Sequence, residues 1–297
     1  MEREAVARLQ EEIPAVMYRV MILDIIFVRH ALSCANVWAN KLYGMHLFYR
    51  DPELTLAGIS TSKDLSSLLI KKITDLWGVE PYSIGASNMI RAQQTSYHML
   101  ASILEKPINV MAHICEAGFS LDNYAYPVDK QREILEDKSP GISKLLSAGL
   151  DGRMSHNIWD KSNFDKFLKW ASLNPEHFEL GSDGRYRAVI FTHSHFLKSA
   201  FHMDDLINNN NAIHTVIDTA NDINNKNGFV YDTWQMNDID LSDICPNDCQ
   251  ISFCDSFLKN LLLFLILLMI GSAFYFYFYF FIIKSKIGKI SEKTKRG

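Results

Sequence analysis

The chain has 297 residues, of which 48% are hydrophobic and 22% charged, and its formal net charge is −4. This length exceeds that of a usual single domain, so we expect one catalytic-sized domain with an additional segment. The acidic balance of the bulk of the sequence argues against nucleic-acid binding.

The N-terminal residues 1–21 form a lead-in without a recognisable secretory signal. Arg19 and Asp24 interrupt the apolar stretch, and Glu2 and Glu4 stand where a signal peptide would be positive. Five cysteines, an odd number, fit a reducing compartment better than a disulfide framework. We therefore expect the bulk of the chain in the cytosol.

Strand and helix patterns then alternate through residues 22–236, which we predict to be one catalytic domain. We expect strands at residues 22–28, 82–87, 108–116 and 187–193, and helices at 54–73, with Thr55 as N-cap, 88–104 and 196–206. Residues 120–180 form an insertion or lid, and residues 212–219 and 229–236 form an antiparallel hairpin. The alternation predicts an α/β fold with a mostly parallel, doubly wound sheet and helices on both faces.

The last part of the chain is predicted to anchor it in a membrane. Residues 237–257 form a polar tether, and 258–283 a transmembrane helix, since 261–283 carry no charge and are long enough to cross a hydrocarbon core of about 30 Å. Residues 284–297 form a basic tail with six basic residues against Glu292. The missing signal favours a single-pass, tail-anchored protein with a cytosolic catalytic domain. The mitochondrial outer membrane or the endoplasmic reticulum is the expected destination. The positive-inside rule favours the opposite orientation.

Basic side chains follow several of the predicted strands at the point where each strand ends. Arg29 and His30 close the first strand, Arg91 starts the helix after the second, and His193 closes the strand at 187–193. Because the carboxyl ends of parallel strands meet at one edge of a sheet, these groups should converge and form an anion site.

At these positions the sequence resembles the histidine phosphatase superfamily, which includes the cofactor-dependent phosphoglycerate mutases. The signature Arg-His-Gly-x-Ser-x-x-Asn is represented by Arg29, His30, Ala31, Ser33 and Asn36. The remaining matches are the Leu-Thr-x-x-Gly pattern, the Ser-x-x-x-Arg-Ala-x-x-Thr pattern, an acidic residue and a second histidine, carried by Leu54, Thr55, Gly58, Ser87, Arg91, Ala92, Thr95, Glu116 and His193. The resemblance implies a phosphoglycerate mutase-like fold over residues 22–200.

The resemblance also implies a mechanism without metal or cofactor. His30 would attack phosphorus and become a phosphohistidine, while Arg29 and Arg91 would clamp the phosphoryl oxygens. Phosphate would also be bound by His193 and Asn36. Glu116 would protonate the leaving oxygen and later take a proton from water.

Some assignments stay open at this point. Asp122 is a second carboxylate that could serve as the acid in place of Glu116, and His195 is a further candidate for the pocket. The sequence departs from the family pattern at Ala31, in place of the signature glycine, at Leu32, where mutases commonly carry Glu, and at Ser194. An alanine that had to adopt a positive φ would be strained by about 1 kcal/mol or more.

We therefore predict a membrane-anchored phosphatase that hydrolyses a phosphate monoester of unknown class. A phosphoglycerate-type mutase is one alternative, and it would need a closed pocket that excludes water. A catalytically weak adaptor that binds phosphorylated ligands is the other.

Overall fold

The computed structural model describes residues 20–41, 49–111, 113–116, 121–146, 163–220, 229–236, 264–270, 272, 274, 275 and 277. The chain divides into two compact units, Met1–Asp248 and Cys249–Gly297. All of the named strands and helices lie in the first unit.

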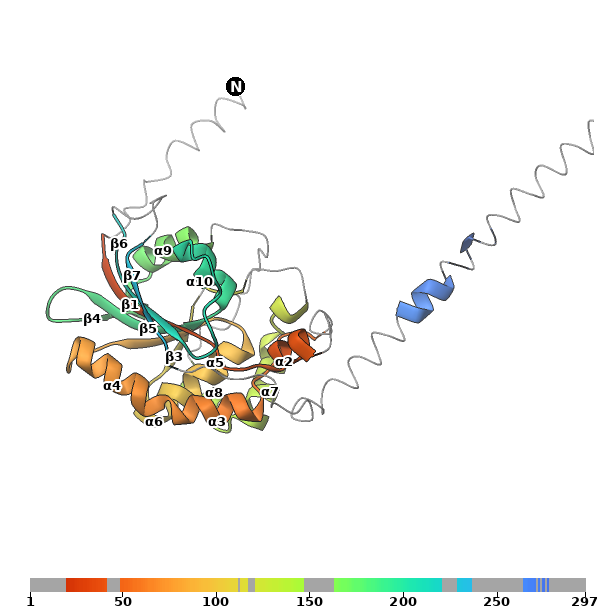
Figure 1. Ribbon diagram of the computed structural model, residues 1–297, viewed down its shortest axis with the longest axis horizontal. Helices are drawn as coiled ribbons and strands as arrows, with labels where there is room; N and C mark the ends of the chain where they lie inside the picture. The colour runs from red at the N-terminus through yellow and green to blue at the C-terminus, as the bar shows by residue number, and fades with distance from the viewer. Residues whose placement is uncertain are drawn as a thin grey trace, which may run out of the picture. The chain divides into compact units, whose positions relative to one another are not determined.

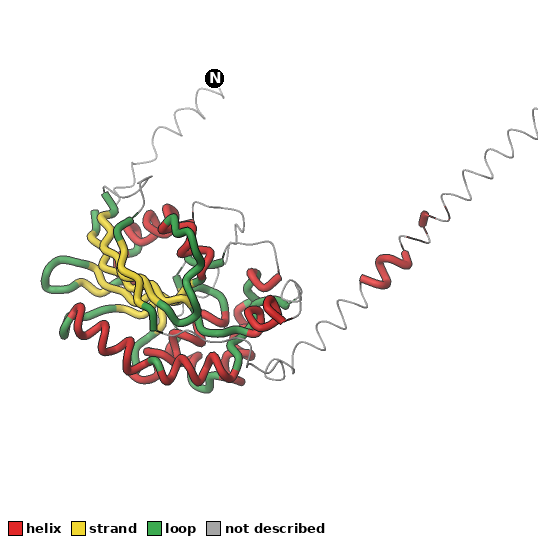
Figure 2. Tube along the Cα trace, in the orientation of Figure 1, coloured by secondary structure: helices red, strands yellow, loops and turns green. Residues whose placement is uncertain are grey.

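The first unit is built around a mixed β-sheet (Figures 1 and 2). Its strands are β1 (Ile22–Arg29), β2 (Ser83–Ala86), β3 (Ile108–Val110), β4 (Glu179–Leu180), β5 (Tyr186–Thr192), β6 (Ala212–Asp218) and β7 (Tyr231–Trp234). The strand order is β3-β2-β5-β1-β6-β7, and β4 pairs with β5 outside this path. The pairings between β3, β2, β5 and β1 are parallel, whereas those of β4, β6 and β7 are antiparallel. This arrangement confirms the α/β sheet and the predicted final hairpin, but the prediction of a mostly parallel sheet is wrong, since three of the six described pairings are antiparallel.

The helical elements occupy the connections between these strands. The named α-helices of the first unit are α2 (Cys34–Lys41), α3 (Leu56–Asp64), α4 (Ser66–Trp77), α5 (Ile90–Ser96), α6 (Ser102–Leu104), α7 (Val128–Lys138), α8 (Ile142–Leu145), α9 (Asn163–Leu173) and α10 (Ser194–Phe201). A π-helical turn η2 (Tyr97–Ala101) lies between α5 and α6, and short 3-10 turns are η3 (Leu121–Asn123) and η5 (Pro175–His177).

The two faces of the sheet are both covered by helices, as predicted (Figure 1). Successive side chains of a strand point to opposite faces. Ile25 and Phe27 of β1 therefore belong to a core shared with α9 and α10, while Ile26 and Val28 belong to a second core shared with α4 and α5. Burial on both faces explains why the central strands are nearly continuous apolar runs.

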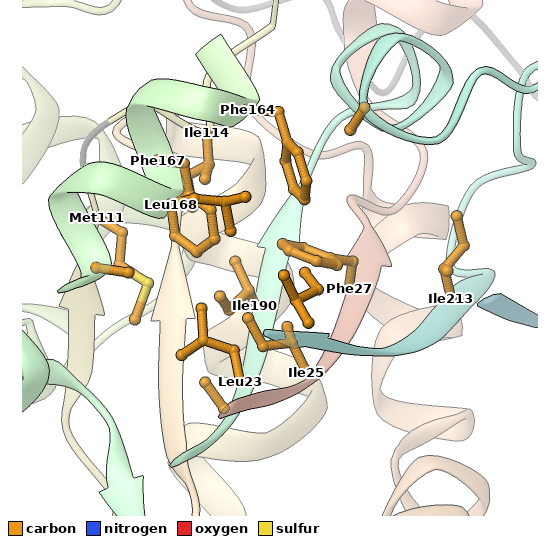
Figure 3. Packing of buried hydrophobic residues seen from close by; sticks show 14 of the residues in the cluster. Leu23, Ile25, Phe27, Met111, Ile114, Phe164, Phe167, Leu168, Ile190 and Ile213 are labelled. Carbon is orange, nitrogen blue, oxygen red and sulfur yellow. The ribbon is translucent and has the colours of Figure 1, made fainter. Parts of the chain in front are cut away.

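Phe27 is at the centre of the first of these cores (Figure 3). The centroid of its ring lies 6.2 and 6.0 Å from the ring centroids of Phe164 and Phe167 in α9. It lies 6.1 and 5.8 Å from those of Phe196 and Phe201 in α10. Truncating such a ring costs about 3–5 kcal/mol. This aromatic cluster fixes the end of β1, three residues before His30.

Several elements differ from the prediction. The helix predicted for residues 196–206 is α10, which begins at Ser194 and ends at Phe201. The helix predicted for residues 54–73 is split into α3 and α4 at Leu65, although Thr55 does cap α3 by accepting the N–H of Gly58 at 2.8 Å. The helix at 88–104 contains the π-helical turn. The strand predicted for 108–116 ends at Val110, and His113 adopts a left-handed φ of 66°, which a strand cannot accommodate.

Two other predicted regions are described in part. Of the insertion at 120–180, the structure describes 121–146 and 163–180, and Phe164, Phe167 and Leu168 of this region belong to the core next to Phe27. Among the described cysteines, Cys115 is a free thiol and Cys34 is disulfide-bonded, and the latter runs against the reducing compartment expected from the cysteine count.

Of the predicted span 258–283, only residues 264–270, 272, 274, 275 and 277 are described, and those at 264–270 are helical. Among the described residues, no helix has both the length and the apolar character needed to cross a bilayer. The lead-in 1–19, the tether 237–257 and the tail 284–297 lie outside the described residues.

Candidate active site

The carboxyl ends of β1 and β5 bring two histidines together. Arg29 and Thr192 are partners in the parallel register of these strands, and the backbone N–H of His30 donates to the carbonyl of Thr192 at 2.9 Å. The ring centroids of His30 and His193 are consequently 5.1 Å apart. The predicted convergence of the basic groups at this edge is confirmed for these two residues.

His30 is oriented by a hydrogen bond to its own neighbour. Its Nδ1 lies 2.7 Å from the carbonyl oxygen of Ala31, and because a carbonyl only accepts, Nδ1 carries the proton. Nε2 is then the unprotonated nitrogen, and it accepts from Nε of Arg91 at 3.2 Å. Burial, followed by the charges of Arg91 and Arg29, holds the pKa of His30 well below its ordinary value. The imidazole is therefore neutral, with a lone pair directed into the site.

Arg91 is buried on the first turn of α5 and reaches three groups. Besides His30, its Nη1 donates to the carbonyl of Asp122 at 2.8 Å, and its Nη2 lies 3.4 Å from Oδ1 of Asn123. The Thr95 hydroxyl donates to the carbonyl of Arg91 at 2.7 Å and accepts the N–H of Ala31 at 2.9 Å. Thr95 thus joins the helix of Arg91 to the loop that follows His30.

Arg29 supplies a second guanidinium group at the end of β1. Its Nη1 donates to the carbonyl of Ile207, while its buried Nε has no partner among the described residues. Burial lowers the pKa of Arg29 to about 10, and the field of Glu116 opposes that shift. The group remains protonated at neutral pH, so the site holds a fixed positive charge with an unused donor.

His193 directly follows β5 and is held by the end of β2. Its Nε2 lies 2.7 Å from the hydroxyl of Ser87, and its buried Nδ1 has no partner in the part of the chain that the structure describes. Burial, then the charge of Arg91, keeps the pKa of His193 well below its ordinary value. With the Ser87 hydroxyl donating to Nε2, Nδ1 carries the ring proton, so this nitrogen, like the free Nε of Arg29, can donate to an anion.

Glu116 brings a carboxyl group to the same point. Its Oε1 accepts the backbone N–H of His195, in the first turn of α10, at 3.0 Å. One ligand atom each of His30, Glu116 and His193 lies within 4.8 Å of the others. Burial raises the pKa of Glu116. A carboxyl group with a raised pKa beside a neutral histidine is suited to donate a proton.

The alternative acid Asp122 lies close by but in a different role. Its carbonyl oxygen accepts from Arg91, and its carboxylate raises the pKa of Glu116 through its charge. The grouping of His30 and His193 with a carboxylate, however, includes Glu116. The geometry therefore favours Glu116 as the acid. The side chain of His195 is exposed, and the backbone of this residue rather than its ring makes the recorded bond to Glu116.

The same three groups form a set that a divalent cation could use as ligands. Arg29 and Arg91 nevertheless surround them with positive charge, as their effects on the pKa of His30 show. A cation would be repelled by these guanidinium groups, whereas a phosphoryl group would be attracted by them. The residues fit an anion better than a metal.

Asn36 and Asn209 complete the loop after His30. Oδ1 of Asn36 accepts the N–H of Ser33 at 3.1 Å and lies 3.3 Å from Nδ2 of Asn209. That same Nδ2 donates to the carbonyls of His30 at 2.8 Å and Ala31 at 3.1 Å. No sequence motif points to Asn209, because it lies 173 residues from Asn36 along the chain and meets it only in the fold. Asn209 thereby ties the backbone on both sides of the His30–Ala31 peptide to the loop before β6.

The departures from the family pattern have local explanations. Among the described residues, Ala31 is not one of those with positive φ, so its methyl group causes no backbone strain and packs with Leu54 and Ile59. Gly58 of the Leu-Thr-x-x-Gly pattern is required, since a Cβ there would lie 2.2 Å from the carbonyl oxygen of Leu32. Ser194 is the first residue of α10.

No family model and no curated protein matches this chain. Solved structures that resemble it include phosphatases, a phosphoglycerate mutase and a hydrolase. A phosphoglycerate mutase from Bacillus anthracis str. Sterne is 14% identical, with 76% of this chain and 96% of that chain covered and a TM-score of 0.41.

The ecdysone phosphate phosphatase from Bombix mori, in complex with tungstate, is 12% identical, with 66% of this chain and 92% of that chain covered and a TM-score of 0.40. A structure described as mycobacterial hydrolase 1 is 14% identical, with 67% and 92% covered and a TM-score of 0.40. At these identities and TM-scores the likeness bears on neither substrate nor activity. The chain resembles the superfamily in its motifs and in the residues that they bring together.

Proposed function

We propose that this protein is a phosphatase that hydrolyses a phosphate monoester through a phosphohistidine at His30. The observation that supports this most directly is the neutral His30 ring, whose Nε2 lone pair faces Arg91 and lies beside His193 and a protonatable Glu116. A nucleophile, two guanidinium groups and an acid are the parts that phosphoryl transfer needs.

In the first step, Nε2 of His30 attacks phosphorus and the bond from phosphorus to the ester oxygen breaks. The protonated form of Glu116, which burial favours by raising its pKa, gives its proton to the departing oxygen, which leaves as an alcohol. Arg29, Arg91 and the free Nδ1 of His193 hold the phosphoryl oxygens while their charge redistributes.

In the second step, the Glu116 carboxylate takes a proton from water as the water oxygen attacks phosphorus. The bond from phosphorus to Nε2 breaks, and the electron pair of this bond returns to Nε2 of His30. Inorganic phosphate is then released. The hydrogen bond from Nδ1 to the carbonyl of Ala31 stabilises the same tautomer before and after the cycle.

The environment of Leu32 favours hydrolysis over the mutase alternative. Leu32 is fully buried in a small apolar cluster with Val37, where the superfamily's mutases commonly carry Glu. An apolar residue offers no hydrogen bond to a second polar substrate group. We therefore expect release of inorganic phosphate to dominate over re-donation to the substrate.

The test is hydrolysis of a small aryl phosphate by the purified full chain without added metal. We expect release of inorganic phosphate that persists in excess chelator, because the guanidinium groups supply the positive charge. Loss of activity in chelator with recovery on adding a divalent ion would contradict the mechanism, and phosphate binding without turnover would indicate the adaptor instead.

We further propose that residues 258–283 anchor the enzyme in a membrane, with the catalytic domain in the cytosol. The support is in the sequence: residues 261–283 contain no charged side chain, and a helix of that length matches the hydrocarbon thickness of about 30 Å. The full chain should resist alkaline carbonate extraction, while a chain lacking 258–297 should be released.

Added protease should then digest the domain in intact membranes. Digestion only after detergent would place the domain in a lumen, as the positive-inside rule favours.

A further inference from the structure

The buried carboxylate of Asp51 connects three separate pieces of the chain. Asp51 is 1% exposed in the loop before α3. Its Oδ1 accepts the N–H of Ile90 at 2.9 Å, and its Oδ2 accepts the N–H of Tyr126 at 2.9 Å and Nε2 of Gln131 at 3.0 Å. The backbone of Asp51 has a left-handed φ of 42°, which aspartate tolerates better than most residues. One side chain thus contacts both α5 and the segment that contains η3 and α7.

The first of these contacts caps the helix that carries Arg91. Ile90 is the first residue of α5, and the N-cap residue Met89 provides no side-chain hydrogen bond. A carboxylate that accepts a free N–H at a helix N-terminus is favoured by both the hydrogen bond and the helix dipole. Because Arg91 follows Ile90 directly, Asp51 fixes the backbone from which the guanidinium group extends.

The second contact closes a ring of hydrogen bonds around Arg91. The guanidinium group of Arg91 donates to the carbonyl of Asp122, and four residues later the N–H of Tyr126 donates to Asp51. Asp51 in turn accepts the N–H of Ile90. The segment 122–126 is therefore fastened at one end to the guanidinium group of Arg91 and at the other, through Asp51, to the backbone of Ile90.

Two other links join the loop of Asp51 to the segment that contains η3 and α7, without reaching α5. Arg50 donates through Nη2 to the carbonyl of Ala125 at 2.6 Å, and Glu53 pairs with Nζ of Lys138 at 2.6 Å. These links stabilise the segment but do not contact the N-terminus of the Arg91 helix. They offer a matched control for the role of Asp51.

We propose that Asp51 is a positioning residue for the phosphoryl-transfer site, which sets Arg91 against His30 by joining the start of α5 to residues 122–126. This inference rests on the proposed function. Burial raises the pKa of Asp51 to about 6, even though three donors bond to its carboxylate. Keeping this carboxylate charged therefore costs free energy in the folded protein, which is expected of a group whose role is to position other residues.

The main test compares Asp51→Asn with Glu53→Gln in the full chain. Asparagine has one acceptor oxygen where Asp51 serves two backbone amides, so either Ile90 or Tyr126 loses its partner. We expect kcat/KM for an aryl phosphate to fall about 10- to 100-fold, with a rise in KM and in the Kd of inorganic phosphate measured by calorimetry. Glu53→Gln should stay within about 2-fold.

A merely structural role would give a different pattern. It would lower kcat in proportion to the folded fraction and leave KM and the phosphate Kd unchanged, and that result would overturn the proposal. If the wild type binds no phosphate and hydrolyses nothing, the proposed function fails, whereas hydrogen exchange of peptides that contain Ile90 and Tyr126 still tests the ring. Exchange in Asp51→Asn as slow as in wild type would refute it.

Ile90→Pro tests the same link if Asp51→Asn does not fold. Proline is favoured at the first position of a helix, and Met89 before it is already extended, at φ −86° and ψ 137°. The change therefore removes the N–H that bonds to Asp51 and keeps the helix. We expect the same loss of phosphate affinity, with Ile90→Val, which retains the N–H, as its control. Equal phosphate affinity of the two variants would contradict the proposal.

Discussion

The two ends of strands β1 and β5 both hold clusters of acidic, arginine and histidine side chains, but only one of the two clusters forms the candidate active site. At the first end, Asp24 of β1 lies opposite Arg187 of β5 in the parallel register. Nε2 of His214 on β6 bonds to Asp24 at 2.8 Å. At the other end, Arg29 and His30 of β1 lie beside the residues that close β5.

The difference between the ends is their charge balance. Arg187 faces three acids, with Nη2 at 2.8 Å from Asp183, Nη1 at 3.5 Å from Glu80 and Nε at 3.7 Å from Asp24. At the other end Glu116 faces two guanidinium groups, and nitrogens of Arg29 and His193 have no described partner. Buried histidine and arginine therefore do not by themselves indicate a functional site. Nitrogens without a hydrogen-bond partner occur at both described ends, Nε and Nη1 of Arg187 included, so the excess of positive charge is what distinguishes the end with His30.

Removing the nucleophile is the most direct test of the contrast between the two ends. His30→Ala should lower the kcat of aryl phosphate hydrolysis by about 10⁴-fold or more, since no second nucleophile occupies that point. The free energy of unfolding should change little in comparison. His214→Ala is the matched histidine control and should retain KM, and comparable activity losses in the two variants would contradict the contrast between the ends.

The acid should show the next largest effect. Glu116→Gln cannot donate a proton, and general acid catalysis contributes about 10²- to 10⁴-fold, so kcat should fall by about 10²-fold or more. In the wild type, kcat should decline as the pH rises through the raised pKa of Glu116, because only the protonated form is active in the first step. Asp122→Asn is the control, and a larger loss in that variant would reassign the acid.

The sequence predicted the site better than the surrounding connections. The positions of His30 and His193 follow from the rule that parallel strands end at one edge of a sheet, and Arg91 follows from its motif. Asn209, Asp51 and Ser87 were not predicted as site residues, because their roles depend on bonds to segments distant in the chain. Likewise, the end of β3 depends on the left-handed His113, which no apolar pattern reveals.

Removing the cation from the balanced end should affect stability rather than catalysis. Arg187→Met removes the cation beside the buried Asp24, and breaking a buried pair on one side costs about 3–5 kcal/mol. Denaturant unfolding should show a loss of about 3 kcal/mol, while the KM of the folded enzyme stays unchanged. A raised KM with unchanged stability would reverse the assignment of the two ends.

The smallest effect concerns the pH dependence of stability at Asp51. Its pKa is raised from 3.8 to about 6, mainly by burial, which the charge of Arg91 opposes. The folded protein therefore binds this proton more tightly than the unfolded chain, and the contribution of Asp51 to stability falls as the pH rises toward 6. The stability of wild type relative to Asp51→Asn should drop by about 1.4 kcal/mol between pH 5 and 7.5. A constant difference would show that Asp51 does not titrate in this range.

The central claim is that phosphorus becomes bonded to Nε2 of His30, and acid-labile labelling tests it most directly. The full chain is mixed with a ³²P-labelled monoester, quenched in alkali and digested, and the labelled peptide is identified by mass spectrometry. We predict an acid-labile phosphoryl group on His30 that is absent in His30→Ala and persists longer in Glu116→Gln. Turnover without any label on His30, or an acid-stable label on another residue, would contradict the account.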